Sequence, residues 1–282
     1  MIRGAVEQVT VAVLDALARD EAPTSAALRL LLRTYAATGR DDVRDAIEPA
    51  LARALELAPS APLDEQSHWL FLFAEAAEMS GDDRLPSAAA VLVDHLRSTW
   101  GRGRPPLDAA AAGIDACLRA TGLVSAVDLT QAAIDELERI VGATYQPGSG
   151  VSEKLTDQIA VASALITAYQ GTARLPYSML AEELMQSARR SMWDNERGAF
   201  FDREAAVGGS MFGLNCEAVT VLSRLAALHR SAEYREAAVI APGADYDDDA
   251  ARILEALAPD AFGLGLGGAV YGLAAAEHHS AL

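Results

Sequence analysis

The stretch that decides the fold is ALITAYQGTARLPYSM, residues 164–179, in which an apolar helical segment leads through a short polar turn into a second helical segment. The same phrase recurs at 32–47 (LRTYAATGRDDVRDAI), 73–88 (FAEAAEMSGDDRLPSA), 114–129 (IDACLRATGLVSAVDL) and 224–239 (RLAALHRSAEYREAAV). The first four turns each contain a glycine, and these glycines recur about every 40–50 residues: Gly39, Gly81, Gly122 and Gly171. Glycine directly after a helix end commonly adopts the left-handed conformation that caps the helix. Each of these segments therefore predicts a helical hairpin.

Extending the 3.6-residue apolar period toward both ends predicts about twelve helices. One set is lined with small and apolar residues and is expected at 24–38, 65–79, 108–120, 156–169, 213–229 and 263–277. The other set is more charged and is expected at 4–19, 41–57, 84–99, 124–141, 174–192 and 232–257, with a break at APGADY, 241–246. An apolar helix is buried all round, whereas an amphipathic helix faces water on one side. The first set therefore predicts an inner ring and the second an outer ring.

Two sets of six helices suggest a closed structure. We predict an all-α fold, an (α/α)6 toroid of about twelve helices in two concentric rings, formed by residues 1–282 as one domain. The alternative is an open solenoid of the tetratricopeptide type, whose period of about 34 residues is shorter than the spacing found here. Seven residues of the inner helices are expected to be buried: Ala160, Leu165, Tyr169, Leu222, Leu225, Val270 and Leu273.

Connection lengths orient the predicted ring. Turns from inner to outer helices are short, whereas the returns are long, as in 58–67 (APSAPLDEQS), 101–108 (GRGRPPLD) and 142–155 (GATYQPGSGVSEKL). Long loops on a rigid scaffold are where binding and catalysis usually occur, and helix N-termini favour anionic groups. We therefore expect a site at the mouth formed by the inner-helix N-termini.

The composition limits the classes of partner. The formal net charge is −17, from 40 acidic and 23 basic side chains, and such a field repels nucleic acid and anionic membrane surfaces. Glu7 and Asp15 interrupt the N-terminal apolar run, unlike the core of a signal peptide, and the apolar run at 261–276 is too short and Gly-rich to span a membrane. Cys117 and Cys216 form no metal-ligand cluster. We expect a cytoplasmic protein without metal or cofactor.

Two segments resemble a known family: 155–203 (LTDQIAVASALITAYQGTARLPYSMLAEELMQSARRSMWDNERGAFFDR) and 215–238 (NCEAVTVLSRLAALHRSAEYREAA). They are similar to the (α/α)6 portion of thioredoxin-domain-containing proteins of the spermatogenesis-associated protein 20 type, over about residues 150–277. The resemblance implies a six-hairpin glycosidase-like toroid, akin to N-acylglucosamine 2-epimerases and unsaturated glucuronyl hydrolases, without defining a reaction. The thioredoxin-like domain of that family, with its CxxC motif, is absent from this sequence.

Polar residues expected at the mouth suggest chemistry on a small polar or sugar-like ligand. Sugar hydrolysis needs one protonated and one ionised carboxyl group, and Asp157 and Glu217 at the starts of adjacent inner helices are the natural pair, with Asp202 nearby. Residues expected to contact the ligand are Asp64, Glu65, His68, Arg102, Trp193 and Asn215, with Arg104 beside them. The competing explanation is that acidic residues in first helical turns only cap the helix.

The sequence leaves catalysis open. Aromatic residues make up only 6%, although carbohydrate sites often use aromatic platforms, and the Ala- and Gly-rich inner helices suggest little room for a deep polar cavity. His68 is the only histidine expected near the mouth, which disfavours an epimerase. The alternative is a non-catalytic toroid that binds a ligand or an unknown protein partner, and a mouth filled by Phe200, Phe201 and Met211 would favour it.

The stretch 192–219 (MWDNERGAFFDREAAVGGSMFGLNCEAV) is expected to form the rim. Trp193 should pack on the last turn of the preceding helix, Gly198 should permit a tight reversal, and 199–201 should be extended. Alternation along that segment then points Phe201 inward and Asp202 toward the mouth, and the alternative is that Asp202 only satisfies backbone donors of this long loop. Gly208 and Gly209 should turn the chain into a helix capped near Asn215.

Overall fold

The computed structural model describes residues 2–101, 105–202, 211–238 and 243–281. Within this part of the chain there are thirteen α-helices, which confirms the all-α prediction of about twelve helices. The other elements are the short 3-10 helices η1 (Ala58–Ser60), η2 (Ala120–Gly122) and η3 (Gly265–Gly268) and the two-residue strands β1 (Trp193–Asp194) and β2 (Ala199–Phe200).

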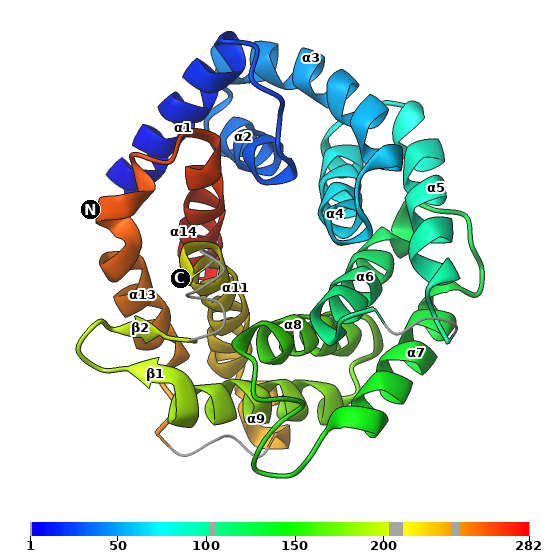
Figure 1. The fold of residues 1–282 in the computed structure, drawn as a ribbon, viewed down its shortest axis with the longest axis vertical. Helices are drawn as coiled ribbons and strands as arrows, with labels where there is room; N and C mark the ends of the chain where they lie inside the picture. The colour runs from blue at the N-terminus through cyan, green and yellow to red at the C-terminus, as the bar shows by residue number, and fades with distance from the viewer. Residues whose placement is uncertain (1, 102–104, 203–210, 239–242, 282) are drawn as a thin grey trace.

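Six of the described helices surround a central axis (Figure 1): α2 (Ser25–Thr38), α4 (Leu63–Met79), α6 (Leu107–Arg119), α8 (Leu155–Thr172), α11 (Met211–Arg230) and α14 (Ala269–Ala281). Each contacts the next along the chain, and α14 contacts α2. The contacts therefore close a ring rather than continuing as an open solenoid.

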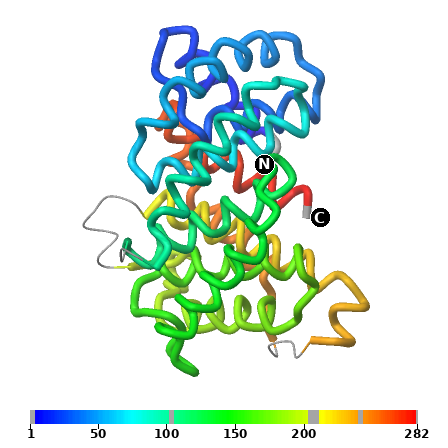
Figure 2. The backbone as a smooth tube through the Cα atoms, turned by 90° about the vertical axis from the view of Figure 1, so that its right-hand side faces the viewer, coloured from blue at the N-terminus to red at the C-terminus, as the bar shows by residue number. Residues whose placement is uncertain are grey.

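The other described helices lie outside this ring: α1 (Ile2–Ala18), α3 (Asp41–Leu57), α5 (Arg84–Ser98), α7 (Leu129–Thr144), α9 (Leu175–Met192), α12 (Ala232–Ala237) and α13 (Tyr246–Ala261). Each inner helix packs against the outer helix that follows it, and α14 packs against α1. Figure 2 shows the first helices (blue and cyan) at one end of the long axis and the green and yellow helices at the other, as expected for a chain that travels around a ring.

Local capping fixes several helix ends. The hydroxyl of Thr24 accepts a hydrogen bond from the amide of Ala27 at 3.2 Å and starts α2. Gly39 ends this helix in the left-handed conformation, with a φ of 66°. In α13, the side chain of Asp245 accepts from the amide of Asp248 at 3.0 Å. This cap restarts the outer ring after the predicted break.

The other predicted glycine caps are wrong. The helix α4 ends in extended backbone at Ser80, so Gly81 lies beyond it, and Gly122 lies within η2. The helix α8 continues past Gly171, and Ala173 takes the left-handed conformation instead, with a φ of 56°. A cap position depends on where the tertiary packing ends, which the turn glycines alone do not fix.

Two predicted helices begin later than expected. The outer helix predicted from residue 124 begins at Leu129, after a turn at 124–128, and the inner helix predicted from residue 263 begins at Ala269. The glycine-rich segment before Ala269 forms η3 instead, because glycine is a poor helix former.

The hydrophobic core is one connected cluster of buried residues. Three of the predicted core residues are buried: Leu165, Leu222 and Leu225. Ala160, Val270 and Leu273 are only partly buried because they line a cavity inside the inner ring. Tyr169 is partly buried and meets Tyr234 edge to face. These four residues correct the prediction that the inner helices are buried on all sides.

The rim hairpin agrees with its predicted course. Trp193 directly follows α9, and the guanidinium carbon of Arg189 lies 4.2 Å from the centre of its ring. The strands β1 and β2 pair antiparallel, with Trp193 opposite Phe200. Gly198 makes the reversal with a φ of 69°, and its amide donates to the carbonyl of Asp194 at 2.9 Å. Gly208 and Gly209 lie outside the described residues.

The predicted directions of the side chains at the end of this hairpin are wrong. Phe201 is 37% exposed, whereas Asp202 is only 9% exposed and accepts a hydrogen bond from the amide of Leu155 at 3.0 Å. Asn215 lies inside α11 rather than at its cap, and its side chain bonds both the amide and the carbonyl of Phe200. A terminal amide donor of α8 therefore turns Asp202 inward, and strand alternation does not continue past β2.

The segment between α13 and α14 contains a tight contact at Gly268, and we expect Gly268→Ala to lower the free energy of unfolding by about 1–3 kcal/mol. A Cβ there would lie 2.5 Å from the carbonyl oxygen of Ala261, a backbone atom that cannot rotate away. Gly267→Ala is the matched control, since its Cβ would lie at ordinary contact distance, 3.6 Å from Leu264. Urea denaturation of both variants measures the difference. Equal stabilities would show that the backbone at η3 relaxes freely.

Candidate functional site

The inner ring encloses a cavity of about 180 Å³, lined by residues from all six inner helices. Its apolar wall includes Phe71, Ile159, Ala160, Val270 and Leu273. Polar and charged groups of the same helices complete the lining. The sequence-based expectation of little room for a polar cavity is therefore wrong.

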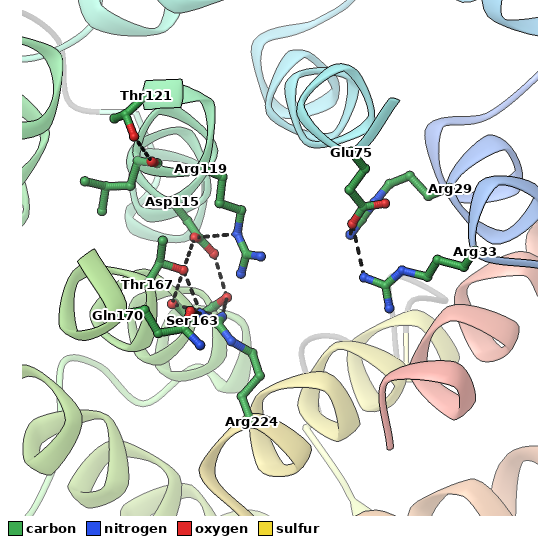
Figure 3. A network of polar contacts seen from close by, with 11 residues as sticks. Arg29, Arg33, Glu75, Asp115, Arg119, Thr121, Ser163, Thr167, Gln170 and Arg224 are labelled. Carbon is green, nitrogen blue, oxygen red and sulfur yellow. Dashed lines mark hydrogen bonds and ion pairs between the residues drawn. The ribbon is translucent and has the colours of Figure 1, made fainter. Parts of the chain in front are cut away.

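One side of the cavity contains an ion-pair chain across three helices, and Figure 3 shows the part formed by Arg29, Arg33 and Glu75. Arg29 of α2 binds Glu75 of α4 in a bidentate pair, with N–O distances of 2.7 and 3.1 Å. Arg33 donates to Glu75 at 3.1 Å and to Glu277 of α14 at 2.7 Å. Burial alone would raise the pKa of Glu75, but Arg29 and Arg33 lower it to about 2. The chain joins the first, second and last inner helices.

The other side contains a cluster centred on Asp115 of α6 (Figure 3). Asp115 is 2% exposed and accepts from Arg119 at 3.0 Å, from Ser163 at 2.6 Å and from Thr167 at 2.5 Å. Arg224 of α11 donates to the hydroxyls of Ser163 and Thr167 at 3.1 and 2.8 Å. Burial opposes ionisation, but Arg119 and Arg224 outweigh it and hold the pKa of Asp115 below its usual range.

An aromatic ring links the two sides. The guanidinium carbons of Arg29 and Arg119 lie 5.5 and 5.2 Å from the centre of the Phe71 ring. Both distances are within the range of a cation–π contact. Phe71 therefore holds the two guanidinium groups from different sides of the cavity against one apolar surface.

Glu217 is the predicted catalytic residue that faces the cavity. Its side chain is exposed because it projects into the open volume, although the ring surrounds that volume. Removal from bulk water, with the charge of Asp108 as a second cause, raises the pKa of Glu217 to about 7. A carboxyl group that titrates near neutral pH can either donate or accept a proton there.

The other two predicted catalytic carboxylates, Asp157 and Asp202, accept hydrogen bonds from the backbone and from a loop side chain. Asp157 is 7% exposed, and its oxygens accept from the amide of Asp108 at 3.0 Å and from the hydroxyl of Ser152 at 2.7 Å. Asp202 accepts from the amide of Leu155. Neither residue lines the cavity, so this geometry favours a structural role for both. The structure places neither beside Glu217 in the cavity, where a catalytic pair would be required.

The predicted ligand-contacting residues divide in the same way. His68 lines the cavity, and burial, followed by the charge of Arg29, lowers its pKa. Asp64 and Glu65 are exposed in the first turn of α4, outside the cavity lining. Trp193 belongs to the rim hairpin, and Asn215 of α11 bonds to the backbone of that hairpin, while Arg102 and Arg104 lie outside the described residues.

Four cavity arginines were not predicted from the sequence, namely Arg29, Arg33, Arg119 and Arg224. A signal was available, because each is a charged residue in a helix otherwise lined with apolar side chains. An arginine in such a helix needs either a buried carboxylate or a polar cavity. Asp115 and Arg119 also have the i, i+4 spacing of a pair on one helix face.

Other chemistry receives no support from the described residues. They contain no group of three or more His, Cys, Asp or Glu side chains that could hold a metal ion. Burial raises the pKa of Cys117 to about 12 and raises that of Cys216, so neither is a thiolate near neutral pH. Among the described helices α11 alone is long and apolar enough to cross a membrane, and 61% of that apolar window is buried in the ring.

No protein-family model matches this chain, and comparison with curated proteins finds no match.

The pKa of Glu217 predicts a pH-dependent effect on stability. Its folded-state pKa is raised, so its contribution is fully present below the unfolded value of 4.5 and is lost as pH rises through about 7. We expect Glu217→Gln to be more stable than wild type by about 1 kcal/mol at pH 8, a value discounted for screening by cavity water, and by much less at pH 5. Chemical denaturation at both pH values measures this. Glu78→Gln, at an exposed position of α4, controls for the loss of one negative charge. The same difference at both pH values would contradict the prediction.

Proposed function

We propose that the protein binds a small polar ligand in the cavity of the inner ring. The observation that supports this most directly is the lining, in which four arginines, Glu217 and His68 meet an apolar wall. Small-molecule sites are concave, largely apolar and fitted with a few convergent polar groups. The volume of about 180 Å³ is well above the minimum that one water molecule needs, and it suits a monosaccharide or polyol rather than a polymer.

The rim aromatics support the same proposal over a protein-binding role. Phe200 is buried against Trp193, and Phe201 packs with Arg197 outside the cavity lining. Met211 also does not line the cavity. A mouth filled by these side chains was the feature expected of a non-catalytic module.

Catalysis is a second candidate, supported by Glu217. A hydrolase needs a protonated and an ionised carboxyl group, and the raised pKa of Glu217 supplies the first. Asp108, whose charge acts on Glu217, is the candidate second carboxylate, although like Asp157 it does not line the cavity. In this proposal Glu217 gives a proton to the leaving oxygen as its bond to carbon breaks, and Asp108 accepts a proton from the water whose oxygen forms the new bond to that carbon.

Melting measurements with a small-molecule panel test the binding proposal. The panel contains neutral and acidic monosaccharides and polyols at about 10 mM, and a ligand present well above its Kd raises the melting temperature by a few degrees. Ala160→Phe fills the cavity without removing a charge and should abolish the rise. If no member raises the melting temperature, or if the rise persists in Ala160→Phe, the proposal fails.

A further inference from the structure

One cavity arginine has hydrogen-bond donors left over for an anion, and a second adds a positive charge that no carboxylate contacts directly among the described residues. Arg119 donates through Nε to Asp115, while its Nη1 and Nη2 groups have no hydrogen-bond partner among the described residues. Its side chain is 32% exposed and lines the cavity. Arg119 therefore presents a free pair of donors to whatever occupies the cavity.

Arg224 has neutral hydrogen-bond partners in the described part of the chain. Besides the hydroxyls of Ser163 and Thr167, it donates to the carbonyl of Ser163 at 3.2 Å and to the amide oxygen of Gln170 at 2.9 Å. The residue is 7% exposed. A buried guanidinium that no carboxylate contacts directly is costly unless a charge nearby compensates it.

The nearest compensating charge is already shared. Asp115 accepts from Arg119 and from two hydroxyls, so its single negative charge faces two guanidinium groups. On the opposite side, Arg29 and Arg33 are matched by Glu75 and Glu277. While Glu217 is protonated, one positive charge is therefore in excess in the cavity, on the side of Arg119 and Arg224.

The lowered pKa of Arg224 is consistent with this excess of positive charge. Burial, followed by repulsion from Arg119, lowers the pKa of Arg224 to about 9. The group stays charged near neutral pH. Figure 3 shows the guanidinium ends of Arg119 and Arg33 pointing toward each other across the cavity, with Arg224 beside Asp115.

We propose that Arg119 and Arg224 form a subsite for one carboxylate group of the ligand, so that the cavity selects a small organic monoanion over its neutral analogue. A planar guanidinium binds a carboxylate through two parallel hydrogen bonds. One excess positive charge matches a carboxylate better than a phosphate monoester, which is close to a dianion near neutral pH. The apolar wall of Phe71, Ile159 and Leu273 then contacts the rest of the ligand. This inference rests on the proposed function and specifies its ligand class.

Three matched probes test the subsite by calorimetry: gluconate, sorbitol and sorbitol 6-phosphate. Gluconate and sorbitol have the same carbon chain and differ at one end by a carboxylate in place of a hydroxymethyl group. We expect wild type to bind gluconate at least about tenfold more tightly than sorbitol, and more tightly than the phosphate ester. Arg119→Gln should remove this preference, with a much larger loss of affinity for gluconate than for sorbitol.

Three further variants make the test specific. Arg119→Lys keeps the charge without the two-donor fork and should retain part of the preference, while Arg139→Gln removes an exposed arginine of α7 and should retain all of it. Arg224→Gln repeats the test from α11, with circular dichroism as a check of folding.

Equal affinity for gluconate and sorbitol in wild type overturns the subsite but leaves the proposed function standing. If the phosphate ester binds best, the carboxylate assignment is wrong. If Ala160→Phe still binds gluconate, or wild type binds none of the probes, the proposed function fails as well.

Discussion

Asp115→Ala should lower the free energy of unfolding by about 3–5 kcal/mol, the range for removing one partner of a buried ion pair. The substitution removes the acceptor of Arg119 and of two hydroxyls. It also leaves Arg224, which is 7% exposed, without the negative charge that acts on it through Ser163 and Thr167. Two guanidinium groups would then repel each other inside the ring.

The control is an ion pair on the outer surface. Asp45 is 68% exposed and binds Arg44 at 3.0 Å, and removal of such a pair changes stability little. Urea denaturation of Asp115→Ala and Asp45→Ala at one pH gives the comparison. In Asp115→Ala, added gluconate should recover part of the lost stability, because a bound carboxylate would take the place of Asp115. A loss below about 1 kcal/mol would show that cavity water solvates the arginines adequately.

The helices were predictable because their signals are local. The apolar period, the polar turns and the caps at Thr24 and Gly39 all lie within one or two helical turns of the structure that they specify. The rim reversal at Gly198 was predictable for the same reason. Ring closure followed from counting such units.

The contacts that build the site were not predictable in this way. Arg33 and Glu277 are 244 residues apart in the sequence and meet only because the ring closes. Asp157 lies in the first turn of α8, as expected, whereas Glu217 lies nearly two turns into the described α11, and Asp157 turns toward the amide of Asp108 rather than into the cavity. The choice between capping and catalysis depends on tertiary neighbours that one helix does not reveal.

Glu182 shows the same limit on the outer ring. In the segment MLAEELMQSARRS its charge suggested a helix face in water, yet Glu182 is only 3% exposed. It accepts hydrogen bonds from Tyr234 of α12 at 2.8 Å and from Tyr246 of α13 at 3.3 Å, and it lies 2.9 Å from Nε2 of His229. The break in the outer ring between α12 and α13 brings both tyrosines to this one carboxylate.

Because three elements meet at that carboxylate, Glu182→Ala should lower the free energy of unfolding by about 3–5 kcal/mol. The substitution leaves two buried phenol donors and the His229 ring without their acceptor. Burial, followed by other contacts that include Glu182, raises the pKa of both tyrosines, so they stay protonated and cannot replace the lost charge. Glu182→Gln keeps the shape and one acceptor oxygen, and should cost less than the alanine variant.

The adjacent Glu183→Ala is the matched control, since it removes the same charge from the same helix turn. Glu183 is only partly buried and accepts from the amide of Gly148 at 3.2 Å, so its removal should cost about 1 kcal/mol or less. Hydrogen exchange of α12 amides in the two variants locates the effect, because loss of Glu182 should release α12 while the inner ring stays protected. Equal losses for Glu182→Ala and Glu183→Ala, with α12 still protected, would mean that α12 is held by the packing of Tyr234 on Tyr169 rather than by the buried carboxylate.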